Sequence, residues 1–385
     1  YSGELQFTSG KFSFGIPVDL ELVDMALSQM VTDFERPYVY GLHPGSGEFA
    51  DAFLVFINTD SEQIEKVIPI GINPTDMTIN YGEGRLYVTN WLRDATRVVD
   101  LQTQEELTPL MLGTDVFKIN AGRPGRIYYE EEDQWIDVPI VDTASGLIVG
   151  ELPFSIREGD GEIDPTGSYY YHCDNNSSAA NITKFDITTD TPVILAESIE
   201  RPYGSRNLLL SGDGSRLFWR GYVYDADLAE IGNLGSEIYA TTLGGELAFS
   251  DTAVFNTNSG ATLYTLPVPS SVMAVSGDQS KLFVYDDATG VIEAIPMSDI
   301  AAVPGPGLNP EPADGDTIVL PADSLSWQLS PLAVGYRVYL GTDEAAVAAA
   351  DESSPEYLGE VGGNSIDIGS LDPGGAYYWR VDQVG

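Results

Sequence analysis

The 385-residue sequence is poor in the residue types on which much enzyme and redox chemistry depends. It contains one cysteine, Cys173, and two histidines, His43 and His172. One cysteine excludes an intrachain disulfide, and two histidines exclude a multi-histidine metal centre or a haem-bearing arrangement within one chain. The G-x-S-x-G motif of one large class of serine hydrolases does not occur. Composition and repeats therefore say more about function than catalytic motifs do.

Basic residues are also scarce. Acidic residues outnumber them 59 to 18, which gives a formal net charge of -41. A nucleic acid is excluded as a partner because neutralising phosphates requires a basic face. An anionic membrane surface is disfavoured for the same reason. No hydrophobic run approaches the length of a membrane span, so the sequence predicts no membrane span.

The excess of acidic residues has two interpretations, which are compatible with each other. In the first, the acids form the solvated surface of an extracellular protein, in surroundings where salt screens their repulsion. In the second, some of them bind hard cations, chiefly calcium, because calcium prefers oxygen ligands. The composition alone does not decide between them.

A short phrase recurs seven times between Tyr38 and Tyr285: a turn, a strand of aromatic and aliphatic residues, and then Asp or Asn near Thr or Ser. The spacing between copies is 30 to 48 residues. Periods of this size are typical of repeated β units such as propeller blades. The copies are PYVYG from Pro37, GRLYVTN from Gly84, GRIYYE from Gly125, GSYYYH from Gly167, GSRLFWR from Gly214, GELAFSD from Gly245 and SKLFVYD from Ser280.

Each repeat contains four short β runs, most clearly between residues 74 and 113, where DMTIN, RLYVTN, TRVVDL and EELTPLML follow one another. The third run ends in an Asp or Asn, as at Asn58, Asp100 and Asp142, and in the last repeat the equivalent residue is Asp287. Side chains of this kind accept hydrogen bonds from backbone groups two residues further on and favour tight turns. We therefore interpret these regularly spaced residues as turn formers.

The second repeat carries a specific signature. Tyr87, Val88, Thr89 and Asn90 form the tetrapeptide of the YVTN family of β-propeller repeats, and residues 23–300 resemble that family. The resemblance implies a place among surface-layer and secreted proteins. The recurring phrase predicts seven blades, with six or eight as the alternatives. Propellers of this kind usually close by borrowing a strand from the other end of the chain, and the N-terminal segment is a candidate for it. Its candidate residues are Ser9, Lys11, Phe12, Phe14 and Ile16.

The composition changes near residue 301. A linker rich in Pro and Gly follows, and residues 317–385 then contain short strands without the repeat. Leu371, Pro373 and Tyr377 have the spacing of a tyrosine corner, and this part resembles a fibronectin type III-like module that lacks its last strand. Two hypotheses follow for the N-terminal segment: it closes its own propeller, or it completes the sandwich of a neighbouring copy by strand addition.

The predicted fold class is therefore all-β, a seven-bladed β-propeller followed by a fibronectin type III-like β-sandwich. The predicted organisation is an N-terminal strand segment at 1–22, the propeller at 23–300, the linker at 301–316 and the sandwich at 317–385. Two domains agree with a chain that is too long for one ordinary core.

Two stretches with acids at alternate positions are the candidate metal sites. The first, EGDGEIDPTG, offers Asp160, Glu162 and Asp164, and the second, ADGD, offers Asp314 and Asp316. Alternating acids let one loop place several oxygens around a calcium ion. Neither matches the complete EF-hand pattern, and ordinary turns are the competing interpretation. Calcium is the one cofactor that the sequence suggests.

Asn175, Asn176 and Asn181 each satisfy the N-glycosylation sequon in a polar loop. Acidic residues at positions 130–133 are expected to form a solvated hairpin tip. The five tryptophans have two interpretations: they wedge neighbouring blades, or they stack on a sugar at the propeller mouth.

The leading functional hypothesis is a noncatalytic extracellular protein at the cell surface, a subunit of a surface layer or filament or an adhesion component. Its partners are then further copies of itself, other cell-surface proteins or glycans. A second hypothesis is a secreted protein that binds or degrades carbohydrate in the propeller channel. A third is a propeller hydrolase or lactonase that uses a channel-bound calcium.

Overall fold

The computed structural model describes residues 2–9, 12–19, 26–45, 51–90, 95–131, 134–152, 156–157, 159–175, 179–300, 308–312, 324–328, 335–369, 371 and 375–384. The chain divides into two compact units, Tyr1–Ile295 and Pro296–Gly385. In this part of the chain, no helix combines the length and the apolar character that crossing a membrane would require.

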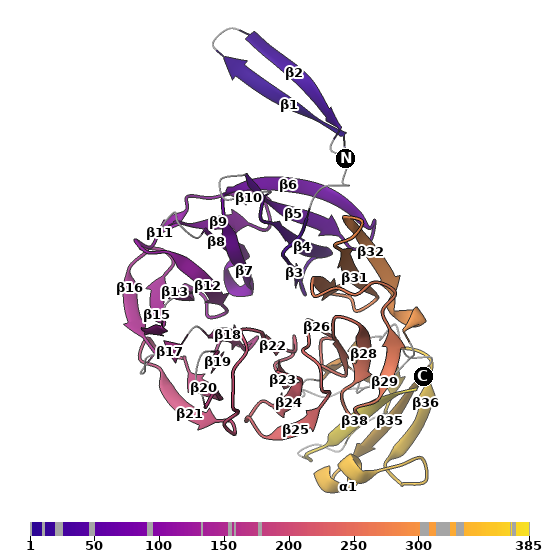
Figure 1. Cartoon of the computed structure of the whole chain (residues 1–385). Coiled ribbons are helices and arrows are strands. Elements are labelled where there is room, and N and C mark those ends of the chain that lie inside the picture. Colours follow the sequence, from indigo (N-terminus) through magenta and orange to yellow (C-terminus); the bar gives the residue numbers. More distant parts are fainter. Residues whose placement is uncertain are drawn as a thin grey trace. The chain divides into compact units, whose positions relative to one another are not determined.

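The first unit is built from successive antiparallel sheets that are arranged radially, with one strand of each sheet lying innermost (Figure 1). The first three sheets contain β3 (Gln29–Thr32), β4 (Tyr38–His43), β5 (Ala52–Asn58) and β6 (Gln63–Gly71); β7 (Pro74–Asn80), β8 (Arg85–Asn90), β9 (Ala95–Asp100), β10 (Glu105–Glu106) and β11 (Leu110–Met111); and β12 (Val116–Ala121), β13 (Arg126–Glu131), β15 (Pro139–Asp142) and β16 (Ile148–Glu151). A short 3₁₀ turn, η2 (Tyr81–Glu83), joins β7 to β8, and β14 (Gln134–Ile136) pairs with β17 (Ile156–Arg157) beside the third sheet.

Four more sheets follow along the chain. They contain β18 (Asp160–Ile163), β19 (Tyr169–Cys173), β20 (Ile182–Asp186) and β21 (Val193–Glu197); β22 (Leu208–Leu210), β23 (Arg216–Trp219), β24 (Tyr222–Asp225) and β25 (Glu230–Asn233); β26 (Ala240–Thr241), β27 (Leu247–Phe249), β28 (Ala253–Asn256) and β29 (Thr262–Thr265); and β30 (Met273–Val275), β31 (Lys281–Asp286) and β32 (Val291–Pro296). A 3₁₀ turn, η3 (Met297–Asp299), ends this series. The last sheet has three strands among the described residues.

The recurring sequence phrase forms the second strand of every sheet, from β4 to β31. Most of its aromatic and aliphatic residues are buried, because a blade packs against a neighbour on each face, and Tyr169 is an exposed exception. The four runs between residues 74 and 113 form β7, β8, β9 and the short outer strands β10 and β11, in the predicted order. The recurring phrase therefore marks the strand of each sheet that is covered by neighbouring sheets on both faces.

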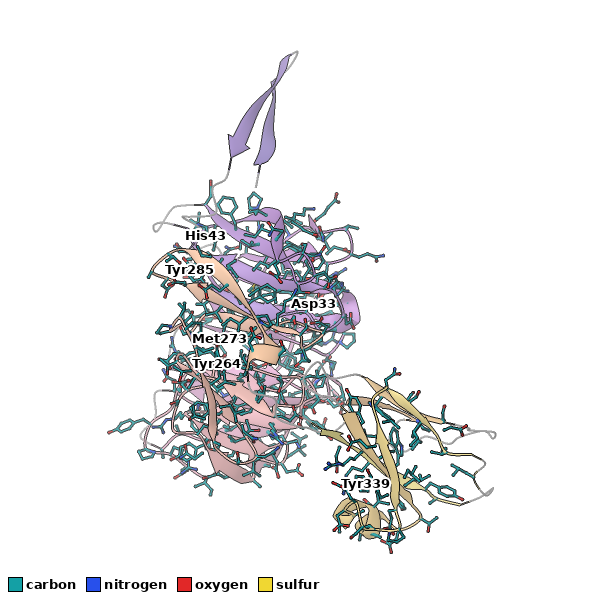
Figure 2. The ribbon with its side chains drawn as sticks, turned by 90° about the vertical axis from the view of Figure 1, so that its right-hand side faces the viewer. Asp33, His43, Tyr264, Met273, Tyr285 and Tyr339 are labelled. Atoms are coloured by element: carbon teal, nitrogen blue, oxygen red, sulfur yellow. The ribbon has the colours of Figure 1, made fainter. Side chains whose placement is uncertain are left out.

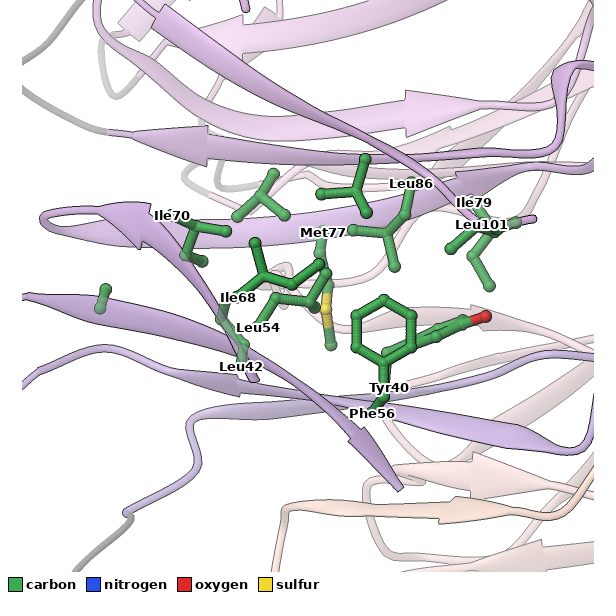
Figure 3. Packing of buried hydrophobic residues seen from close by; sticks show 13 residues of the cluster. Tyr40, Leu42, Leu54, Phe56, Ile68, Ile70, Met77, Ile79, Leu86 and Leu101 are labelled. Atoms are coloured by element: carbon green, nitrogen blue, oxygen red, sulfur yellow. The ribbon is translucent and has the colours of Figure 1, made fainter. Parts of the chain in front are cut away.

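The core of this unit consists of side chains between neighbouring sheets. Between the first and second sheets, Phe56 and Tyr40 pack edge to face at 5.0 Å, and Met77 and Leu86 come from the second sheet (Figure 3). Burying a large apolar side chain contributes on the order of 2 kcal/mol. Stability is thus spread over successive sheet-to-sheet layers.

The first and last sheets also pack against each other. Val39 and Val55 of the first sheet share an apolar cluster with Phe283 and Tyr285 of the last, and Figure 2 labels Tyr285. Thr32 Oγ1 donates to the Val275 carbonyl over 2.7 Å. Lys281 Nζ donates to the Thr59 carbonyl over 2.7 Å and pairs with Glu62 at 2.9 Å. We call these contacts between the first and last sheets the seam.

The N-terminal segment forms a hairpin of β1 (Ser2–Ser9) and β2 (Phe12–Asp19). The register pairs Phe7 with Phe14 and Leu5 with Ile16. In the described residues β2 thus pairs with β1, and the last sheet ends at β32. The segment predicted for residues 1–22 contains two strands, and closure of the propeller by this segment stays a prediction. The alternative, addition to a neighbouring copy, stays a prediction.

The second unit consists of two three-stranded sheets and one short helix. One sheet has the order β33 (Leu308–Glu311), β34 (Ser324–Gln328), β37 (Ser365–Asp367), and the other has the order β36 (Tyr357–Val361), β35 (Gly335–Gly341), β38 (Tyr378–Val384). Helix α1 (Glu344–Ala349) begins at the N-cap Asp343, whose side chain accepts from the Ala346 amide. β33 lies inside the predicted linker 301–316, so this part of the linker belongs to a sheet because it pairs with β34.

Candidate functional site

Charged side chains gather on the inner strands of three consecutive sheets. Asp76 lies on β7, Lys118 on β12, and Asp160 and Glu162 on β18. Residues two apart on a strand point to the same face, so Asp160 and Glu162 share one face of β18. β12 lies beside both β7 and β18. We call these four residues the central cluster.

Asp160 connects the inner strands on both sides of its own. Lys118 Nζ lies 3.2 Å from Asp160 Oδ1, and the Leu208 amide on β22 donates to Asp160 Oδ2 over 3.1 Å. A buried carboxylate is costly unless it is paired and hydrogen bonded. Both oxygens of Asp160 have such a partner, which explains how it is accommodated at the centre.

Asp76 has the same role two sheets earlier. Its Oδ1 accepts from Gln29 Nε2 over 2.8 Å, and its Oδ2 accepts from the Ile119 amide over 2.9 Å. Gln29 Oε1 in turn accepts from the Met77 amide over 3.1 Å. Side chains of the inner strands therefore bond to the next inner strand from the first sheet to the fifth.

The central cluster perturbs the pKa values of its own members. Burial raises the pKa of Asp160 to about 6, while the positive charge of Lys118 acts in the opposite direction. Burial and the neighbouring charge of Asp160 raise the pKa of Glu162 well above its usual range. Burial lowers the pKa of Lys118, but the carboxylates of Asp160 and Asp76 outweigh this effect, so the pKa is raised and the ammonium stays charged.

A buried acid and base lie on the second strands beside this cluster. His172 Nε2 on β19 is 2.9 Å from Glu130 Oε1 on β13, and the Gly159 amide donates to Glu130 Oε2 over 3.1 Å. Both side chains are almost wholly buried. A Cβ at Gly159 would overlap the His172 ring and the Cys173 carbonyl, so the close approach requires glycine.

The Glu130 carboxylate controls the charge of His172. Burial lowers the pKa of His172, but the charge of Glu130 and its hydrogen bond outweigh burial, and the pKa is raised. Among the described residues, His172 Nδ1 has no hydrogen-bond partner. The pair is thus an ion pair at low pH and loses its positive charge as the pH rises.

These groups are arranged to hold strands together. The hydrogen-bonding atoms of Asp76 and Asp160 face neighbouring backbone, and the ammonium of Lys118 faces Asp160. In the part of the chain that the structure describes, no group of three His, Cys, Asp or Glu residues is placed to hold a metal ion. Electrostatic linkage between sheets is the chemistry that these contacts support.

The first candidate metal site differs from the predicted loop. Asp160 and Glu162 lie on a strand, β18, because the alternating sequence pairs with β19. Asp164 follows the strand, and its carboxylate accepts from the amides of Thr166, Ser168 and Tyr169. The three acids therefore lie on a strand and in the turn after it, and not in one loop, while calcium binding by them stays a prediction.

The other predicted site residues are only partly described. Asp314, Asp316, Asn176 and Lys11 lie outside the described residues, and calcium binding stays a prediction. Asn175 and Asn181 lie half-buried between β19 and β20. Ser9 ends β1, and Phe12, Phe14 and Ile16 lie on β2.

The regularly spaced Asp and Asn residues form turns, as their position predicts. Asp100 Oδ1 accepts from the amides of Gln102 and Thr103 over 3.0 and 2.8 Å. Equivalent bonds are made by Asn58, Asp142, Asp186, Asp225 and Asn256. In the last sheet the turn former is Asp286 and not Asp287, because the Asp286 carboxylate receives the Ala288 amide.

Two features of the central region were not predicted. Residues 130–133 were expected to be a solvated tip, whereas Glu130 is buried against His172 because β13 extends to Glu131. No sequence pattern indicated that Lys118 and Asp76 lie in the central cluster, because one charged residue within an apolar strand does not show which strand lies beside it. The rarity of Lys and His in this chain was the available hint, because buried ones need a partner.

Apolar side chains gather on the outer strands of the third, fourth and fifth sheets. Ile148 on β16, Leu195 on β21 and Ile231 on β25 are each at least half exposed, at 59%, 50% and 51%. Val193 and Ile194 on β21 are exposed as well. β16, β21 and β25 follow one another along the outside of the radial arrangement (Figure 1). We call the exposed apolar residues of these three strands the outer apolar band.

The radial sheets define the fold as an all-β propeller, and two solved structures are similar to it. Hydrazine synthase from Kuenenia stuttgartiensis matches with a TM-score of 0.57 and 13% identity, over 71% of this chain and 96% of that chain. The β-propeller domain of Cps50 (Swd1) from Myceliophteria thermophila matches with a TM-score of 0.53 and 12% identity, over 70% of this chain and 96% of that chain. Such low identities show the fold alone.

No protein-family model matches the chain, and no curated protein matches it in sequence.

Proposed function

We propose that this protein is a noncatalytic extracellular structural or adhesion protein, a subunit of a surface layer or filament built on a propeller scaffold. Its partners are copies of itself or other cell-surface proteins. The acidic composition and the YVTN-like repeat support the extracellular part of the proposal, because a net charge of -41 keeps a protein soluble outside the cell.

The proposal includes the finer features of the fold. We propose a seven-bladed propeller that closes through the packing of its first and last sheets, and a fibronectin type III-like sandwich in the second unit. The Thr32 and Lys281 hydrogen bonds across the seam support the closure. The sandwich is supported by the shared core of its two sheets, which contains Leu325 and Trp327 from one sheet and Val338 and Val381 from the other.

The outer apolar band is the observation that carries the proposed function. Outer strands are normally protected by charged residues, because an unpaired edge invites association. This chain has 59 acidic residues, yet β16, β21 and β25 expose aliphatic side chains. Clustered apolar residues on a soluble protein mark a surface that binds a partner.

The central cluster supports the noncatalytic part of the proposal. The carboxylate oxygens of Asp76 and Asp160 are bonded to neighbouring strands, and Lys118 is paired. A catalytic group has to keep an atom within reach of a substrate. The Asp76 and Asp160 carboxylates and the Lys118 ammonium are engaged in holding the propeller together.

Sedimentation velocity of the full chain at rising concentration, in low and in high salt, tests this function. We expect self-association that increases with salt, because salt screens the repulsion between copies that carry a net charge of -41. Ile148→Lys should weaken association about tenfold or more, because it places a solvated charge in the apolar contact.

Val291→Lys provides the matched control. Val291 lies on β32 and is 47% exposed, but its sheet is not one of the three that form the outer apolar band. Association that falls equally in both variants would show that any added charge has this effect. A chain that stays monomeric at every concentration and salt level would refute the assembly function.

A second candidate function is carbohydrate binding or degradation at the centre of the propeller. It is favoured by two neighbouring carboxyl groups with raised pKa values, Asp160 and Glu162, since glycosidases use a protonated and an ionised carboxyl together. Incubation with a panel of oligosaccharides, with binding and reducing-end release measured for the natural chain and Glu162→Gln, tests it. Equal results for both chains would exclude a role for Glu162.

A further inference from the structure

The turn between β3 and β4 carries an aromatic side chain, Phe34, that reaches beyond its own sheet. A Cβ atom on Gly212, in the turn after β22, would lie 2.5 Å from Phe34 Cζ and 2.7 Å from Leu243 Cδ1. Gly212 belongs to the fifth sheet, and Leu243 follows β26 of the sixth. The sixth and seventh sheets separate the fifth from the first in the radial arrangement (Figure 1). Phe34 therefore packs across the centre against a sheet that is not a neighbour of its own.

Asp33 fixes the turn from which Phe34 projects. Its side chain is buried, and Oδ1 accepts from the Glu35 and Arg36 amides over 2.9 and 3.1 Å. Its Oδ2 accepts from the Tyr40 hydroxyl over 2.7 Å. A carboxylate that accepts from amides two and three residues further on closes a tight turn. The backbone at Phe34 thus has a defined position, from which the side chain points to the centre.

Both sheets beside the first one hold the same turn. The Tyr81 hydroxyl of the second sheet donates to the Thr32 carbonyl over 3.1 Å and accepts from the Phe34 amide over 3.3 Å. On the other side, a Cβ at Gly277 in the last sheet would overlap the Asp33 carbonyl oxygen, so this approach requires glycine. The turn that carries Phe34 is therefore part of the seam.

The turns that Phe34 packs against are bonded to one another and to the last sheet. The Asp213 amide donates to the Leu243 carbonyl over 2.9 Å, and the Leu243 amide donates to Gln279 Oε1 over 2.7 Å. Gln279 is buried in the turn between β30 and β31. The turns of the fifth, sixth and last sheets thus form one hydrogen-bonded series, and Phe34 joins the first sheet to it.

We infer that Phe34 holds the seam closed by packing across the centre, and that the first and last sheets separate only when this side chain leaves Gly212. Separation of these sheets moves the Phe34 turn away from the bonded series, so it breaks the seam contacts and the contact across the centre together. The side chain is 37% exposed, which leaves it a path toward solvent. The inference goes beyond the proposed function, because it concerns how one propeller stays closed and not what it binds.

Two substitutions in the full-length chain act on this contact from opposite sides of the centre. Phe34→Ala removes the side chain, whereas Gly212→Ala keeps it and adds a methyl group where it packs. Each should speed hydrogen exchange of the β3, β30 and β31 amides about tenfold or more, because the seam opens more often. Exchange is followed by mass spectrometry. The amides of β13 and β19, in the third and fourth sheets, are the internal reference and should change little.

Gly232→Ala is the matched control for Gly212→Ala. Gly232 lies on β25 of the same sheet, and a Cβ there would meet its nearest neighbour, Val223, at an ordinary 3.8 Å. This variant should leave exchange at the seam unchanged. In a chain that already carries Phe34→Ala, Gly212→Ala should add much less than it does alone, because the side chain that it displaces is gone.

Circular dichroism shows whether Phe34→Ala remains folded. If it does not, Gly212→Ala and the milder Phe34→Leu still test the inference, since both weaken the same contact. The inference is wrong if Gly212→Ala speeds exchange only within the fifth sheet, because the contact then does not act on the seam. It is also wrong if exchange on β13 and β19 rises as much as at the seam, because Phe34 then stabilises the whole unit without a particular role in closing it.

Discussion

The centre of the propeller and its outer strands reverse the usual distribution of residues. Charged side chains, among them Asp76, Lys118 and Asp160, lie at the centre, and each is engaged with a neighbouring strand. Aliphatic side chains such as Ile148 and Leu195 lie exposed on the outer strands. The charge at the centre thus holds sheets together, and the apolar residues outside are the ones available to a partner.

This difference follows from the geometry of a radial fold. Inner strands lie close together, so a side chain can reach the backbone of the next sheet, as Asp76 reaches Ile119. Outer strands diverge and leave room for solvent or for another molecule. The same kind of residue therefore has a different role at each radius.

The largest expected effect on the free energy of unfolding comes from replacing Lys118. Lys118→Met should lower the free energy of unfolding by about 3 kcal/mol, because it leaves the buried Asp160 carboxylate without its cation. Guanidinium denaturation at pH 7 measures this effect. Lys66→Met on β6, in the outer part of the first sheet, is the control and should change stability by less than about 0.5 kcal/mol. Equal losses in both variants would contradict the structural role of the central charge.

A smaller effect, dependent on pH, is expected at His172. Because the folded-state pKa of His172 is raised above 6.5, its stabilising contribution is complete below pH 6.5 and is lost as the pH rises through the folded-state value. His172→Gln should therefore cost about 1.5 kcal/mol near pH 5.5 and less near pH 8.5. Denaturation curves across this range measure the difference between the two chains.

His43→Gln is the control for this experiment, because the His43 Nδ1 atom contacts the Ala26 carbonyl instead of a carboxylate. Its stability relative to the natural chain, measured at the same pH values, gives the effect of removing a histidine that faces no carboxylate. A His172→Gln difference that stays constant from pH 5.5 to 8.5 would show that Glu130 does not hold a charged imidazole.

The smallest effect is expected at the outer turns. Asp100→Ala removes the acceptor of the Gln102 and Thr103 amides and should cost less than about 1 kcal/mol. Asp100→Asn should be nearly neutral, since Asn58 forms the same turn in the first sheet. Thermal melting of the two variants compares them. A larger loss for Asn than for Ala would indicate that the charge matters more than the turn.

The Asp100 contribution also has a defined dependence on pH. Hydrogen bonds from Thr103 hold the pKa of Asp100 below its usual value. The corresponding stability is present above the usual pKa and is lost as the pH falls through the lowered one. The natural chain and Asp100→Asn should therefore differ most at neutral pH and least in strong acid.

Local sequence patterns predicted well which strand of each sheet is covered on both faces and where the turns lie. The alternating aromatic strand marks β8 and β19 because a blade covered on both faces needs apolar residues at nearly every position. Asp and Asn at the ends of the third strands predicted turns, because the acceptor and the amide that it binds are two or three residues apart. Both features depend on neighbours in the sequence.

The central cluster depends on residues that are far apart in the sequence. Glu130 and His172 are separated by 42 positions, and the contact exists only because β13 and β19 occupy equivalent places in adjacent sheets. A run of four acids at Glu130 suggested exposure, since acidic runs usually face solvent. Strand β13 includes the first two residues of the expected hairpin tip, Glu130 and Glu131, and this placed the first acid inside.

The seam has a mechanical consequence. The first and last sheets meet through side chains, among them Thr32 and Lys281, and in the described residues no strand is shared between them. A backbone ladder placed under load in shear would share the force over many bonds, whereas side-chain contacts separate a few at a time. Successive sheets are joined by the chain itself as well as by side chains, whereas the first and last sheets are not consecutive in the chain. When subunits of an assembly are stretched, we therefore expect the propeller to part first at the seam.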